Sequence, residues 1–67
     1  MKVESKILTL IRFNYPKDTS IDELYAYLKP HGQALVERKC RLLKEKGFIE
    51  IAVIGPHGKI TFYKLKQ

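Results

Sequence analysis

Hydrophobic residues recur with a helical period in three stretches of the chain. In the first stretch, spacings of four, three and one residues place them on one face of a helix over about residues 4–13: Val3, Ile7, Leu10 and Ile11. Asn14, Pro16 and Asp18 follow, and residues of these types break a helix and form a loop. The pattern therefore predicts one amphipathic helix near the start of the chain.

The second stretch begins with the signature of a helix start. Ser20 and Glu23 have the spacing of a capping box, in which the serine oxygen accepts from the N–H of residue 23 and the glutamate reaches back to the N–H of residue 20. Pro30 ends the helix, because the residue before a proline disfavours helical geometry. We expect a short helix over about residues 20–29.

The third stretch predicts a helix over about residues 33–46. Val36, Cys40 and Leu43 are four and three residues apart and form its buried stripe. Gly47 supplies the C-terminal cap, since glycine takes the left-handed conformation without steric cost. Only about three residues separate this helix from the previous one, and such a short connection forces a sharp crossing of helix-turn-helix type.

Two later stretches alternate with the period of a strand, over about residues 48–54 and 59–65. The turn-forming sequence Gly55-Pro56-His57-Gly58 lies between them and predicts a hairpin tip of about four residues. Closing the tip with an Ile54 to Lys59 pair places two apolar pairs on one face: Ile51 with Phe62, and Val53 with Ile60. We therefore predict an α+β fold, with three helices followed by a two-stranded antiparallel hairpin, in a single domain over residues 1–67.

The net charge of +6 is confined to one half of the chain. Residues 1–28 hold four cations and four anions, whereas residues 29–67 hold nine cations and three anions. This one-sided charge favours a polyanionic partner, with nucleic acid ahead of an anionic membrane. The alternative is a lysine-rich surface that only keeps the protein in solution.

Length and cysteine content limit how the domain is stabilised and where it resides. A chain of 67 residues buries only roughly 60% of its unfolded surface, so we expect a homodimer or unusually dense packing. Leu35 and Leu42 are seven residues apart and indicate a wider buried zone or a subunit contact. The single Cys40, the lack of an apolar run near ~20 residues and the lack of a signal-peptide core predict a cytoplasmic protein.

Catalytic and metal-binding patterns have little support in this sequence. His31, Cys40 and His57 are the only soft or borderline metal ligands, and no two have the short spacing of a structural zinc site. The glycines of the hairpin tip precede no helix, so they do not form a phosphate-binding loop. We expect no enzymatic activity, metal, cofactor or small-molecule substrate.

The predicted order of elements resembles the winged helix-turn-helix family of DNA-binding domains, found in small bacterial, archaeal and viral transcription regulators. The resemblance covers about residues 4–66. Its most specific part is Val36-x3-Cys40-x2-Leu43-x3-Gly47-Phe48-Ile49, which is similar to the end of a recognition helix running into the first wing strand. The family usually has a larger aliphatic residue at the cysteine position, a departure that concerns packing.

The resemblance implies that helix 33–46 enters the major groove and that the wing tip, residues 55–59, lies along the backbone or minor groove. Side chains expected at the groove are Gln33, Glu37, Arg38 and Arg41, and those expected at phosphates are Lys44, His57 and Lys59. Arginine can read guanine and glutamine can read adenine. Glu37 repels phosphate, so we expect it to pair with Arg41, four residues on, more than to read a base.

Two classes of function follow. The first is sequence-specific binding of double-stranded DNA by a homodimeric transcription regulator. The second is a winged-helix module that docks on another protein, or an accessory protein that binds nucleic acid nonspecifically. The polar, cation-rich face of helix 33–46 favours DNA, because a protein-docking helix would expose apolar or aromatic side chains there.

Overall fold

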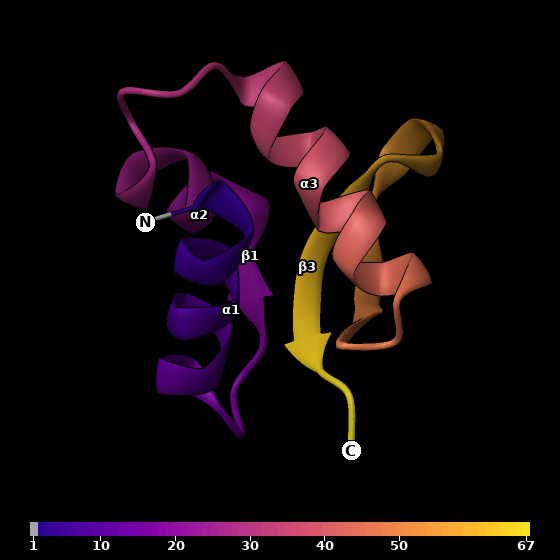
Figure 1. Ribbon diagram of the computed structural model, residues 1–67. Helices are drawn as coiled ribbons and strands as arrows, with labels where there is room; N and C mark the ends of the chain where they lie inside the picture. Colours follow the sequence, from indigo (N-terminus) through magenta and orange to yellow (C-terminus); the bar gives the residue numbers. More distant parts are fainter. Residues whose placement is uncertain (1) are drawn as a thin grey trace.

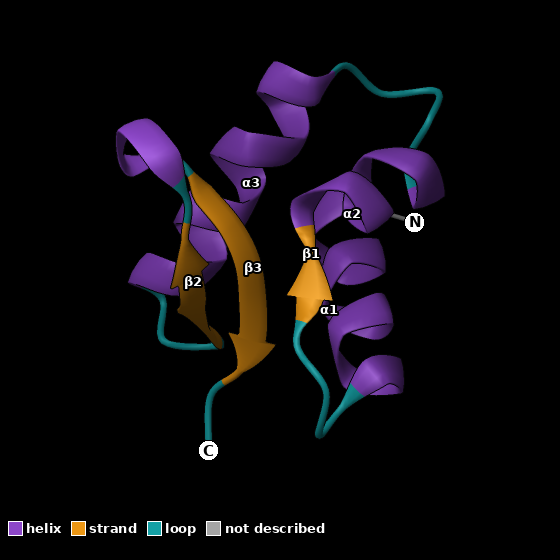
Figure 2. Ribbon diagram, turned by 180° about the vertical axis from the view of Figure 1, so that it is seen from behind, coloured by secondary structure: helices purple, strands orange, loops and turns teal. Residues whose placement is uncertain are grey.

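The structure is a computed structural model that describes residues 2–67. Its elements follow in the order α1 (Val3–Asn14), β1 (Thr19–Ser20), α2 (Ile21–Tyr27), α3 (Gln33–Glu45), β2 (Ile49–Ile54), the 3-10 turn η1 (Pro56–Gly58) and β3 (Ile60–Leu65). In Figure 1, α3 passes in front of β2 and β3, and Figure 2 shows the strands from the other side. Three helices packed on an antiparallel sheet confirm the α+β prediction.

The sheet has three strands, so the prediction of a two-stranded wing was incomplete. The strand order is β1-β3-β2, and β1 pairs antiparallel with β3 through Thr19 opposite Tyr63 and Ser20 opposite Phe62. The Thr19 side chain is fully buried, and its Oγ1 accepts a hydrogen bond of 3.0 Å from Asn14 Nδ2. A strand of two residues is too short to show a period, so the pattern of the sequence did not reveal it.

The register of the hairpin differs by one residue from the prediction. Ile51 lies opposite Tyr63 and Val53 opposite Phe62, with irregular pairing on either side of Val53. The tip contains five residues, closed by a 2.6 Å hydrogen bond from the Gly55 N–H to the carbonyl of Lys59. A shift of one residue exchanges the two faces of a strand, so Tyr63 is buried in the core and Phe62 points outward.

The helix ends lie within two residues of the predicted ones. α2 stops at Tyr27 because Leu28 leaves helical geometry (φ −108°, ψ 32°), and the helix connection therefore has five residues instead of about three. Ser20 Oγ accepts from the Glu23 N–H at 3.0 Å, as the capping box requires. The other half of the predicted capping box, a bond from the Ser20 N–H to the Glu23 carboxylate, was wrong. The Glu23 carboxylate instead accepts a hydrogen bond of 3.1 Å from Asn14 Nδ2.

The core draws side chains from all three helices, β2 and β3. Its buried apolar residues are Ile7, Ile11, Ile21, Leu24, Leu28, Val36, Cys40, Leu43, Ile49 and Tyr63. The stripe predicted for α3 is confirmed, because Val36, Cys40 and Leu43 are all buried. Gly47 has φ +86°, which confirms the left-handed cap.

Burial also affects the chemistry of the single thiol. Desolvation, with a smaller contribution from Glu37, raises the pKa of Cys40 to about 12, so the thiol stays protonated at neutral pH. Cys40 therefore behaves as a small apolar residue of the core. Among residues 2–67, no helix has the length and apolar character needed to cross a membrane.

Candidate nucleic-acid interface

The buried stripe of α3 determines which of its side chains reach solvent. Because Val36, Cys40 and Leu43 face the core, Gln33, Arg38, Arg41 and Lys44 are all exposed on the remaining surface. Glu37 is half-buried on the flank of the helix. The structure thus leaves three cations of α3, Arg38, Arg41 and Lys44, exposed to solvent.

The wing tip carries the other two predicted contact residues. His57 and Lys59 are both exposed, and His57 (φ 63°) is followed by Gly58 (φ 73°), so two successive residues adopt the left-handed conformation. The tip also requires glycine at position 55, because a Cβ there would lie 2.7 Å from the Thr61 Cγ2 atom. These backbone conformations turn the chain sharply and hold both side chains at the end of the hairpin.

A cleft between α3 and the wing tip brings three of the predicted residues together. Glu37 and Arg41 line it from α3, while Gly58 and Lys59 line it from the tip, around a volume of about 220 Å³. Its apolar walls are formed by Ile21, Ile60 and Tyr63. Gln33, Arg38, Lys44 and His57 lie outside this lining. The cleft thus has one cation on each side, Arg41 from α3 and Lys59 from the wing tip.

Glu37 has a partner that sequence analysis missed. The Tyr25 hydroxyl of α2 donates a hydrogen bond to Glu37 Oε1. Burial, and then the bond to Glu37, raise the pKa of Tyr25 well above its usual range. The expected Glu37–Arg41 ion pair is not formed, since every ion pair among the described residues involves Glu4. Tyr25 shares the apolar face of α2, and this position gave no signal that its hydroxyl would reach α3.

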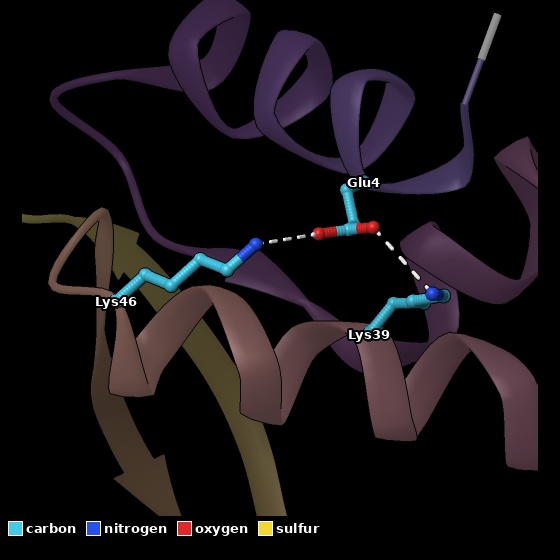
Figure 3. A network of polar contacts seen from close by, with 3 residues as sticks. All are labelled: Glu4, Lys39 and Lys46. Atoms are coloured by element: carbon cyan, nitrogen blue, oxygen red, sulfur yellow. Dashed lines mark hydrogen bonds and ion pairs between the residues drawn. The ribbon is translucent and has the colours of Figure 1, made fainter.

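A second polar network holds α3 against α1. Glu4 of α1 lies between two lysines of α3 and its C-cap, with Oε1 3.5 Å from Lys39 Nζ and Oε2 3.2 Å from Lys46 Nζ (Figure 3). The hydrogen bond and charge of Lys46, together with Lys39, hold the pKa of Glu4 below its usual value. The carboxylate therefore links α1 to α3 on the flank opposite the cleft.

The Glu4 network predicts an acid-dependent contribution to stability. The pKa of Glu4 is lower in the folded protein than in the unfolded chain, so the ionised carboxylate stabilises the folded state at pH values above the unfolded-state pKa. This stabilisation is lost as the pH falls through the folded-state pKa. We expect wild type to be more stable than Glu4→Gln at about pH 7, and the difference to shrink towards about pH 3. Urea unfolding of both proteins at the two pH values measures it. A difference that does not change with pH would contradict this role of the Glu4 charge.

The described part of the chain, residues 2–67, contains no group of three His, Cys, Asp or Glu side chains that could hold a metal ion. Cys40 is enclosed in the core, and His57 is at the wing tip.

Comparison with solved structures identifies a protein of similar fold. The chain resembles the ferric uptake regulator from Francisella tularensis, in a structure with iron, with a TM-score of 0.80 and 25% sequence identity. The similarity covers 100% of this chain and 52% of that protein, so the chain spans about half of its length. No protein-family model matches the sequence, and no curated protein matches it either. The chain thus has a winged-helix fold like that of a known regulator.

Proposed function

We propose that this chain is a sequence-specific double-stranded DNA-binding domain of a transcription regulator, with α3 in the major groove and residues 55–59 on the backbone or minor groove. The observation that carries the proposal is the cleft in which Arg41 of α3 and Lys59 of the wing tip lie on the same surface. Cations on both elements suit a partner whose phosphates run past the helix and the hairpin together.

Each exposed side chain takes a role that its chemistry allows. Arg38 and Arg41 can form paired hydrogen bonds to guanine, and Gln33 can do the same with adenine. Lys44, His57 and Lys59 are exposed, and we assign them to phosphates, which position the protein without carrying sequence information. Glu37, whose carboxylate is bound to Tyr25, supports the helix face and does not read a base.

In the same proposal the regulator is cytoplasmic and acts as a homodimer. Two recognition helices related by a two-fold axis would meet half-sites about one helical turn apart. A site with inverted-repeat symmetry is therefore expected.

Docking on another protein is the second candidate, and one feature of the hairpin favours it. Val53, Ile54 and Phe62 remain 42%, 59% and 37% exposed, and none of the three lines the cleft, so the hairpin carries exposed apolar side chains besides the cleft. Binding to DNA and binding through this surface make different predictions for the experiment below.

The deciding experiment selects bound duplexes from a randomised library at two salt concentrations and sequences them. Enrichment of a motif, with a steep loss of affinity at higher salt, would support sequence-specific binding, and an inverted repeat would support the dimer. Salt-sensitive binding without enrichment would instead indicate an accessory nucleic-acid-binding protein. No binding at low salt would favour protein docking.

Removing the wing cation tests the role of the hairpin tip. Lys59→Ala is expected to weaken binding to all duplexes alike and to reduce the slope of log affinity against log salt by about one. Fluorescence anisotropy titrations at several salt concentrations measure both quantities. Lys17→Ala, which removes an exposed cation from the loop after α1, is the matched control and should leave the slope unchanged. A loss confined to one sequence would show that the wing tip reads bases.

A further inference from the structure

Glu37 accepts a hydrogen bond from Tyr25 and also lies on the same helix as a second candidate partner, Arg41, so the side chain that binds its carboxylate affects the binding surface. It precedes Arg41 by four residues on α3, the spacing and order that favour a glutamate–arginine ion pair along a helix. Both side chains also line the same cleft. In the structure, however, Glu37 Oε1 accepts from the Tyr25 hydroxyl. The Arg41 guanidinium is consequently not engaged by this carboxylate.

We propose that Tyr25 is a positioning residue for DNA binding, because its hydroxyl holds the Glu37 carboxylate towards α2 and so keeps Arg41 free for the nucleic acid. This inference rests on the DNA-binding function proposed above. It assigns a role on the recognition surface to a residue of α2, outside the helix that faces the groove.

The chemistry of a phenol suits this role. A carboxylate repels a polyanion, and a lysine or arginine that paired with this carboxylate would be less available to the polyanion. A neutral hydroxyl donor satisfies one oxygen of the carboxylate and uses no cation. The ring of Tyr25 is half-buried and packs against the core, so the hydroxyl is held next to the Glu37 carboxylate.

The Tyr25–Glu37 hydrogen bond joins α2 and α3 beside the cleft. Tyr25 and Glu37 come from the two helices of the helix-turn-helix, and the bond crosses between them at the wall of the cleft. Glu37 also lies on the cleft side of α3, while Lys39 and Lys46 on the other flank are occupied by Glu4. Arg41 is therefore the cation of α3 whose freedom depends on where the Glu37 carboxylate is held.

Four proteins test the proposal: wild type, Tyr25→Phe, Glu37→Gln, and the double variant that combines both changes. Without the hydroxyl, Glu37 can pair with Arg41, so Tyr25→Phe is expected to weaken DNA binding by on the order of fivefold at low salt. Glu37→Gln removes the competing charge, and the double variant should then bind as tightly as Glu37→Gln alone. Anisotropy titrations with the duplex enriched in the selection, or with a mixed-sequence duplex if none is enriched, measure these affinities.

Two further variants make the result specific. Tyr15→Phe removes the hydroxyl of a tyrosine that is 47% exposed at the end of α1, and it should bind like wild type. Tyr25→Phe should have little further effect in a protein that already carries Arg41→Ala, because the cation that Glu37 would occupy is gone. Thermal unfolding of every variant shows whether it is folded at the temperature of the titrations.

The possible results separate the inference from the function on which it rests. An equal loss from Tyr25→Phe with and without Glu37→Gln would overturn the inference, since Tyr25 would then act independently of Glu37. Unchanged affinity in Tyr25→Phe would overturn it as well, while the DNA-binding function would stand. A wild-type protein that binds no duplex would overturn both. Rescue of Tyr25→Phe by Glu37→Gln is the expected result, and a merely structural role of Tyr25 would not produce it.

Discussion

Replacing Leu24 by alanine is expected to lower the free energy of unfolding by about 2–5 kcal/mol. Leu24 is fully buried in α2, and the smaller side chain would leave a cavity in the core. A domain of 67 residues has a total stability of roughly 3–10 kcal/mol, so the loss is a large share of it. Urea unfolding followed by circular dichroism measures the change, and a substantial unfolded fraction without urea would agree with it.

The control for this prediction is an aromatic residue outside the core. Phe13 is 82% exposed on α1, and Phe13→Ala is expected to change the stability by no more than about 0.5 kcal/mol, although it removes a larger side chain. A loss comparable to that of Leu24→Ala would show that Phe13 is covered in solution. Repeating the unfolding at several protein concentrations would then reveal whether a second copy covers it.

Removing either arginine from the exposed face of α3 is expected to produce the largest loss of DNA binding. Arg38→Ala or Arg41→Ala should each cost about 1–3 kcal/mol at a specific site, which is about fivefold to 150-fold in affinity, and should relax the sequence preference. Both side chains are exposed and project from a helix whose opposite stripe is buried. Affinity titrations and a repeated library selection with each variant measure the two effects.

Arg12→Ala provides the matched control, because it removes an exposed arginine from α1. It should retain both the affinity and the motif selected by wild type, apart from a small effect of net charge. Unchanged affinity in both α3 variants would remove that helix from the interface. The proposed function would then need another surface, and the exposed apolar residues Val53, Ile54 and Phe62 of the hairpin would be the first to test for docking on another protein.

Local regularities explain why much of the fold was predictable. Periodic apolar residues mark all three helices, because one face of each helix must be buried in a common core. Ser20 and Gly47 mark helix ends through hydrogen bonding and backbone conformation that depend only on nearby residues. Once the buried stripe of α3 was identified, the helical period also predicted that Arg38, Arg41 and Lys44 would be exposed.

The errors arose where the outcome depends on contacts between distant segments. The β1 strand exists because Thr19 and Ser20 pair with β3, which lies more than forty residues later in the sequence. No local sequence pattern predicts this pairing. The hairpin register was off by one because the tip holds one more residue than expected, and the burial of Tyr63 against the helices agrees with the observed choice.

The same division applies to the candidate site. Spacing along the chain was enough to predict the helix that carries the cations, its buried stripe and the residues at the wing tip. The shared cleft of Arg41 and Lys59, and the bond of Glu37 to Tyr25 instead of Arg41, depend on how the elements pack and became visible only in the folded chain. A side chain binds the most favourable of the groups that lie near it in space. The packing of α2, α3 and the hairpin determines which groups those are.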